Sequence, residues 1–306
     1  MVIGHQKIWQ FLTRGAAKNR LAHAYLFVGP PQIGKRTLAS EFIKWLLCAK
    51  HGAAVPCQVC HSCQEMEKGA HPDFMLVSPE VDEKQRSRAI GISQIRELQR
   101  RLSLSPYAAD HKVALVSNAD AMSDEAGNAF LKTLEEPSGQ ALIILTALSE
   151  ESILPTIASR CQIIKFLPVP EEKLAHGLEN LYKKNDIRQI LPLALGRPGR
   201  AINILSNHAW LADWEKDKSL FKKIIKSDLA EKFSLAEKLS RDGIYANDLL
   251  EKWQILSREE LLRSVKDNQI NHAMLSFIKN IQITSRILKN SSFSARLALE
   301  DLMIKV

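Results

Sequence analysis

Residues 24–35 read AYLFVGPPQIGK, and this stretch decides the fold. Its first five residues are apolar, which is typical of a short buried strand in a parallel sheet. Its last seven, Gly29 to Lys35, match the first seven positions of a phosphate-binding loop. In such a loop, backbone amides and a lysine surround phosphate oxygens at the N-terminus of a helix. A buried strand that leads into this loop predicts a parallel α/β domain with a phosphate site.

Further strands are expected at four apolar runs, residues 74–77, 113–116, 142–145 and 163–166. Helical patterns separate these runs, and the clearest cover residues 92–104 and 124–134. Such alternation of strands and helices predicts a parallel α/β domain over residues 1–167. The polar stretch 82–88 is expected to be a solvated loop.

A domain boundary is expected at residues 167–170, which read LPVP, because alternating prolines interrupt both strands and helices. The chain beyond this point has helical patterns and no further strand pattern. The expected fold class is therefore α/β plus all-α. It comprises a P-loop parallel-sheet domain (1–167), a helical lid (168–207) and a C-terminal helical domain (208–306).

The composition indicates a globular chain that is large enough for more than one domain. It has 306 residues, of which 45% are hydrophobic and 25% charged. No apolar stretch approaches the ~20 residues of a membrane span, and no basic-then-apolar leader follows Met1, so a cytoplasmic location is expected. The net charge of +8 is compatible with a polyanionic partner, but it is spread over many helices and is weak evidence for DNA contact.

The phosphate loop departs from its usual pattern at the eighth position. The Ser or Thr that would hold Mg²⁺ is replaced by Arg36, and Thr37 comes one residue later, about 100° further round the helix. We expect the loop to form without competent binding of ATP and Mg²⁺. The candidate cofactor-binding residues are Gly29, Gly34, Lys35 and Thr37.

A second element of an ATPase site is also altered. An apolar strand should end in acidic residues that hold the metal and polarise the attacking water. Here the strand 113–116 ends in the neutral Ser117 and Asn118, and Asp120 lies two residues beyond. Without these carboxylates, hydrolysis would be slower by several orders of magnitude.

Four of the five cysteines form a cluster, Cys48, Cys57, Cys60 and Cys63. Four thiolates at such spacings can enclose Zn²⁺ tetrahedrally in a structural site. A disulfide pair is the alternative, which a reducing cytosol disfavours. His61 is a substitute ligand that four cysteines make unnecessary, and Cys161 stands apart as a buried small residue.

Two motifs resemble the AAA+ clamp-loader ATPase family of bacterial DNA polymerase III. Residues 128–137 read NAFLKTLEEP, and residues 159–161 read SRC. The similarity extends more loosely through residues 196–201, GRPGRA, into the tail. It implies an AAA+ domain with a zinc module at residues 48–63, a helical lid and a C-terminal collar through which subunits assemble.

Within that family, gamma/tau subunits carry intact ATPase motifs, whereas delta-prime subunits keep the fold with degraded ones. This sequence resembles the second kind. Against the gamma/tau pattern, Gly199 also occupies the place of the lid arginine that senses phosphate, and Arg200 lies one position away. The resemblance implies a non-hydrolysing subunit that supports loading of the sliding clamp onto primed DNA, with gamma/tau and delta subunits as partners.

In the family, the arginine of the SRC motif is an arginine finger that acts on ATP in a neighbouring subunit, and Arg160 matches it. The alternative for Arg160 is an ordinary ion pair with a nearby carboxylate. Two other functions stay open for the chain: an ATP-hydrolysing gamma/tau-type subunit, and a stand-alone zinc-dependent DNA-binding protein.

Overall fold

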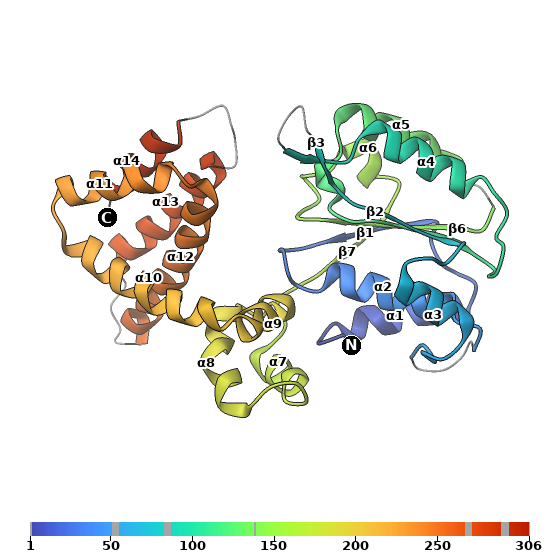
Figure 1. Cartoon of the computed structure of the whole chain (residues 1–306), viewed down its shortest axis with the longest axis horizontal. Helices are drawn as coiled ribbons and strands as arrows, with labels where there is room; N and C mark the ends of the chain where they lie inside the picture. Colours follow the sequence, from blue (N-terminus) through green and yellow to red (C-terminus); the bar gives the residue numbers. More distant parts are fainter. Residues whose placement is uncertain are drawn as a thin grey trace. The chain divides into compact units, whose positions relative to one another are not determined.

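The structure is a computed structural model that describes residues 2–50, 55–82, 87–137, 139–266, 271–288 and 294–305. The chain divides into two compact units, Met1–Leu205 and Ser206–Val306. Figure 1 shows the parallel sheet with its helices in the first unit and a group of helices in the second.

A five-stranded parallel sheet forms the centre of the first unit. Its strand order is β2-β5-β6-β1-β7. The strands are β1 (Ala24–Val28), β2 (Phe74–Val77), β5 (Lys112–Val116), β6 (Ala141–Ala147) and β7 (Gln162–Lys165). The five strands predicted from the sequence are confirmed. The three central strands are buried along their whole length, as expected for a sheet covered on both faces.

Helices cover both faces of this sheet (Figure 1). One face carries α1 (Gln6–Ala17), α2 (Lys35–Leu46) and α3 (His61–Lys68), and the other carries α4 (Ile92–Leu102), α5 (Asp124–Glu135) and α6 (Pro155–Ala158). Successive strand residues point to opposite faces, so Leu26 belongs to one core and its neighbours Tyr25 and Phe27 to the other.

A small antiparallel hairpin corrects one prediction. Glu80–Asp82 (β3) pairs with Ser87–Ala89 (β4), so the ends of the polar stretch 82–88 are strand and not loop. Residues 83–86 lie outside the described residues. The polar composition concealed these strands, because a two-stranded ribbon can expose most of its side chains to water.

Three helices complete the first unit: α7 (Glu171–Leu178), α8 (Lys184–Ala194) and α9 (Pro198–Ser206). They follow the LPVP segment, where Val169 donates a backbone hydrogen bond to Gly196 at 2.7 Å. This bond ties the start of the helical segment to the turn before α9. The separate lid domain at residues 168–207 stays a prediction.

The second unit is helical, as the sequence predicts. It contains α10 (His208–Lys226), α11 (Leu229–Ser240), α12 (Gly243–Lys266), α13 (His272–Leu288) and α14 (Ala295–Ile304). Its core surrounds Trp253, and a buried ion pair joins Lys252 of α12 to Asp217 of α10 at 2.6 Å. None of the described helices in either unit is long and apolar enough to cross a membrane.

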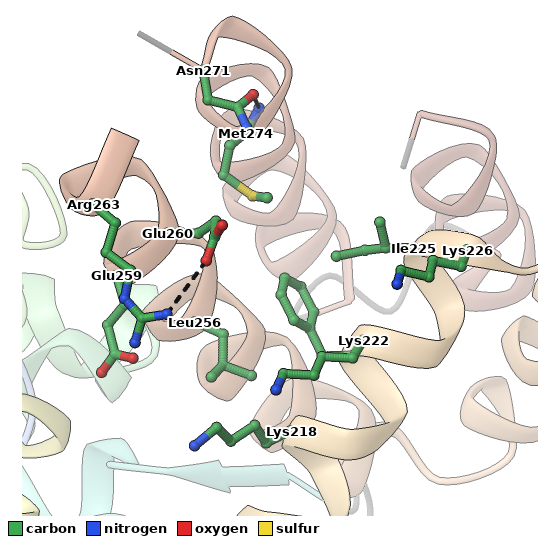
Figure 2. A pocket seen from close by; sticks show the side chains of 11 residues that line it. Lys218, Lys222, Ile225, Lys226, Leu256, Glu259, Glu260, Arg263, Asn271 and Met274 are labelled. Carbon is green, nitrogen blue, oxygen red and sulfur yellow. Dashed lines mark hydrogen bonds and ion pairs between the residues drawn. The ribbon is translucent and has the colours of Figure 1, made fainter. Parts of the chain in front are cut away.

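A groove of about 550 Å³ lies in this unit between α10, α12 and α13, and Figure 2 shows the side chains that line it. Lys218 and Lys222 of α10 lie across from Leu256 of α12. Two acidic residues of α12, Glu259 and Glu260, also line the groove. Its charges are therefore mixed.

Candidate nucleotide site and metal site

The phosphate loop follows β1 and ends where α2 begins. Gly29 has φ +153°, and a Cβ atom at this position would lie 2.7 Å from the carbonyl oxygen of Phe166. Glycine is therefore required at Gly29 for the close approach of the loop to the end of β7. Gly34 is the N-cap of α2, and Lys35 is its first residue.

Lys35 is buried and bonded to the loop itself. Its Nζ donates to the carbonyl oxygens of Gly29 and Pro30 at 2.5 and 2.9 Å. Burial lowers the pKa of Lys35 to about 8, against a smaller opposing effect of the Asp120 carboxylate and a further lowering by Arg197. The ammonium group that would contact phosphate thus has internal acceptors.

The two positions where the sequence predicts lost magnesium ligands lie at the start of α2 and after the end of β5. Arg36 and Thr37 are both exposed on the first turn of α2. At the end of β5, Ser117 is buried, and the backbone amide of Asn118 donates to Thr146 Oγ1 at 3.0 Å. The neighbouring carboxylate is that of Asp120.

The sequence placed Asp120 two residues beyond the neutral Ser117 and Asn118 and did not reveal its relation to the phosphate loop. Asp120 lies in a short 3₁₀ turn, Ala119–Ala121, close enough to Lys35 to affect its pKa. Its Oδ1 atom is buried without a hydrogen-bond partner among the described residues. The short distance in sequence between Asp120 and the end of β5 could have indicated this relation. The 3₁₀ turn after Asn118, which positions the Asp120 carboxylate, is seen only in the structure.

Gly199 brings α9 into direct contact with the phosphate loop. Its backbone N–H donates to the carbonyl oxygen of Gln32 at 2.8 Å. A Cβ atom at Gly199 would lie 2.7 Å from that same oxygen. No side chain, and least of all an arginine, fits at this position while α9 contacts the loop.

The four clustered cysteines converge as the sequence predicts. The sulfur atoms of Cys48, Cys57, Cys60 and Cys63 all lie within 4.8 Å of one another. A tetrahedral zinc ion with Zn–S bonds of about 2.3 Å requires S···S separations of about 3.8 Å, and Cys48 and Cys60 lie at 3.9 Å. The cluster fits a metal ion of this kind.

Local hydrogen bonds prepare two of these sulfurs to be thiolates. The backbone N–H of Cys60 donates to Cys57 Sγ at 3.4 Å, and that of Cys63 donates to Cys60 Sγ at 3.5 Å. Hydrogen bonds from the backbone lower the pKa of Cys57 to about 6. His61 lies at the surface beside Glu65, at 3.3 Å, and is not part of the cluster.

Arg160 lies between α6 and β7, at the N-terminal end of that strand. It donates to Glu135 Oε1 at 2.7 Å and to the carbonyl oxygen of Thr156 at 2.9 Å. Its side chain remains 36% exposed, so it is accessible to a neighbouring molecule. The phosphate loop lies at the C-terminal end of β1, so the structure does not bring Arg160 to the nucleotide site of its own chain.

Together, the phosphate loop, the parallel sheet and the helices that follow it define a P-loop domain of the AAA+ class. The family described as DNA polymerase III, delta subunit, matches residues 4–170, and the chain belongs to this family. Within this family the chain is delta'/gamma/tau-like, because its curated relatives are named as delta', gamma and tau subunits of DNA polymerase III.

The relatives include both kinds of subunit. The chain is 37% identical over 198 residues to DNA polymerase III subunit delta' of Pseudomonas aeruginosa, a match that covers 63% of the chain and 58% of the relative. It is 36% identical over 172 residues to subunit delta' of Bacillus subtilis, across 56% of the chain and 50% of the relative. The chain thus spans 50–58% of the length of these curated relatives.

Two further similarities extend over nearly the whole chain. DNA polymerase III subunit gamma of Buchnera aphidicola is 28% identical over 330 residues, across 99% of the chain and 87% of the relative. A gamma subunit-related protein of Thermotoga maritima has a similar structure, with a TM-score of 0.52, 22% identity and 97% coverage of both chains. The latter similarity supports the fold alone.

Proposed function

We propose that this chain is a non-hydrolysing, delta-prime-like subunit of the DNA polymerase III clamp loader. The observation that carries the proposal is the loss of metal ligands at two separate positions of the ATPase site. Arg36 stands where a hydroxyl should bind Mg²⁺, and Ser117 and Asn118 stand where carboxylates should follow the strand. Each loss alone would impair metal-assisted hydrolysis.

The geometry of the loop supports the same proposal. Lys35 donates to two carbonyl oxygens of its own loop, and α9 contacts the loop at Gln32 through Gly199. A nucleotide would have to replace these bonds to reach Lys35. Glycine at position 199 also leaves α9 without a guanidinium there to contact phosphate.

The role we propose for the chain lies in its neighbour's reaction. Arg160 is the finger that stabilises charge on a transferring phosphoryl group in an adjacent gamma/tau subunit. The proposed partners are gamma/tau and delta subunits, and through them the sliding clamp and primed DNA. The C-terminal unit serves as the collar domain for this assembly, and the zinc ion, held by Cys48, Cys57, Cys60 and Cys63, is structural.

An ATP-hydrolysing subunit of the gamma/tau type is the second candidate. One observation favours it: the buried, unpartnered Oδ1 of Asp120 lies near Lys35, where a carboxylate could assist a metal ion. The family match gives no support to a stand-alone zinc-dependent DNA-binding protein.

ATP turnover by the purified chain with Mg²⁺ decides between these candidates. Our proposal predicts no steady-state hydrolysis above that of a Lys35→Ala variant. Hydrolysis that is lost in both Lys35→Ala and Asp120→Asn would establish the hydrolysing alternative. Reconstitution with gamma/tau and delta subunits then tests assembly, and recovery of neither partner would contradict the proposed complex.

A further inference from the structure

The exposed face of α1 carries a basic surface that the proposed function does not use. It borders an open pocket of about 540 Å³, and its cations are Lys7, Arg14, Lys18 and Arg20. The first three recur at spacings of seven and four, which places them on one side of the helix. Arg20 is folded back over the helix end, because its backbone N–H donates to the carbonyl oxygen of Gly15 at 2.9 Å.

No carboxylate neutralises this surface among the described residues that line it. The four cations form no ion pair within the described part of the chain. Residues 1–40 contain neither Asp nor Glu. The groove of the second unit differs, because Glu259 and Glu260 line it beside its lysines (Figure 2).

Helix stability does not explain this arrangement. Cations near the C-terminus of a helix interact favourably with its dipole, which accounts for Arg14 and Lys18. Lys7, however, lies in the first turn, where a positive charge is unfavourable, and that turn has no acidic residue. The row of cations therefore destabilises the N-terminal end of α1. A charge that is kept at an unfavourable position is expected where the surface binds a ligand.

The length of the row excludes a single phosphate group as its counterpart. From Lys7 to Lys18 the helix rises about 16 Å, at 1.5 Å per residue. Phe11 lies within the row, and 48% of its side chain is exposed beside the cations. Cations that follow a phosphate backbone, together with an aromatic ring on which a base can stack, are the combination that binds single-stranded nucleic acid.

We propose that this α1 surface binds single-stranded DNA through its phosphates, with Phe11 in contact with a base. The inference does not depend on whether the chain hydrolyses ATP. The α1 surface lies beside the N-terminal ends of the strands. Its pocket is also lined by Tyr25, the second residue of β1, and by Gln162, the first residue of β7. The surface is therefore separate from the phosphate loop.

Binding of the full chain to labelled oligothymidylate of about 12 nucleotides tests the proposal, with affinity measured at several salt concentrations. The variant Lys7→Glu/Lys18→Glu should bind at least about tenfold more weakly, and its log–log salt slope should be shallower by about 1.4, because each phosphate contact contributes about 0.7. The control Lys68→Glu/Lys173→Glu changes two exposed cations of the same unit by the same charge. It should bind within about twofold of the unaltered chain.

Two more comparisons separate the base contact from general charge attraction. Phe11→Ala should weaken binding about fivefold or more with an unchanged salt slope, whereas Tyr107→Ala, another exposed aromatic, should not. Polyglutamate of equal charge should compete poorly with oligothymidylate. Circular dichroism checks folding, and Lys7→Gln/Lys18→Gln replaces the charge reversal if that variant is unfolded.

Three results would overturn the proposal. Equal affinity of the α1 variant and its control for the oligonucleotide would show that the α1 surface does not bind DNA. Effective competition by polyglutamate would point to an acidic polypeptide instead. Equal binding of a duplex, with no effect of Phe11→Ala, would exclude the preference for a single strand.

Discussion

The Arg160 guanidinium donates to the Glu135 carboxylate at 2.7 Å, and both side chains remain partly exposed. Such exposed pairs contribute about 0.2 to 1 kcal/mol. An arginine finger contributes about 10³ to 10⁵ in rate, which corresponds to about 4 to 7 kcal/mol. The pair can therefore hold Arg160 in the free chain and still release it to a neighbouring nucleotide at little cost.

Replacement of Arg160 tests this role directly. In an assembly in which only the neighbouring site is competent, Arg160→Ala should lower DNA-stimulated ATP turnover about 10³-fold or more, because the transferring phosphoryl group loses its guanidinium. Glu135→Gln should have a small effect, since it removes only the resting partner. The measurement is single-site ATP turnover in the reconstituted complex.

Arg100 offers a matched control for that experiment. It too is an exposed arginine bound to a carboxylate, with Nε 2.7 Å from Glu97. Arg100→Ala should leave turnover unchanged and have little effect on stability, because the ion pair is exposed to solvent. Equal losses in the Arg160 and Arg100 variants would show that the effect is not that of a finger.

Zinc should be bound in a ratio of one ion per chain and should stabilise the first unit. Cys60→Ser should lose the metal and lower the Tm by about 10 °C, because a loss of a few kcal/mol shifts the Tm by about 3 °C per kcal/mol in a unit of this size. Cys161→Ala should keep the metal, since Cys161 is outside the cluster. Elemental analysis with thermal unfolding measures both, and an unchanged Tm after complete metal removal would contradict a structural role.

The contact of Gly199 with the phosphate loop should tolerate no side chain. Gly199→Ala should lower the free energy of unfolding by about 1 to 3 kcal/mol, because its Cβ atom would collide with the Gln32 carbonyl oxygen. Gly243→Ala is the control, since a Cβ atom there meets nothing within 4 Å. Chemical denaturation compares the two, and similar stability of both variants would mean that α9 moves freely from the loop.

Lys35 should make stability depend on pH in the alkaline range. Its pKa is about 8 in the folded chain and 10.5 without the effects of folding, so between these values the unfolded chain binds more protons. Burial of the charged Lys35 therefore destabilises the folded chain fully below about pH 8. This destabilisation decreases as the pH rises towards 10.5. Relative to Lys35→Met, the native chain should therefore gain stability across this window, by at most about 1.4 kcal/mol per pH unit before solvent screening. Urea unfolding of both chains measures the difference, and a constant difference across the window would contradict it.

Local patterns were sufficient to predict most of the first unit. The apolar run of β1 and the glycines after it predict a strand and loop because buried strands and tight turns restrict residue type locally. The cysteine cluster follows in the same way, since three of its members lie within seven residues of one another. Polar strands escape this reasoning, which is why residues 82–88, whose ends belong to the β3–β4 hairpin, were predicted to be a loop.

Contacts between distant segments could not be predicted. The relation of Asp120 to Lys35 depends on a turn after β5, and the bond from Gly199 to Gln32 joins residues that are far apart in the sequence. The basic surface of α1 is a different case. The absence of acidic residues from 1–40 and the helical spacing of the cations were visible in the sequence, but only the structure shows the pocket beside them.

The pairing of β1 with β7 has a mechanical consequence. Tyr25 pairs with Gln162 and Val28 with Lys165, so the phosphate loop begins at one end of this strand pair and Arg160 lies just before the other. The hydrogen-bonded pairing holds these two ends in a fixed register. In the non-hydrolysing subunit that we propose, no cycle of nucleotide turnover would displace this strand pair, and Arg160 would keep a fixed position relative to the phosphate loop.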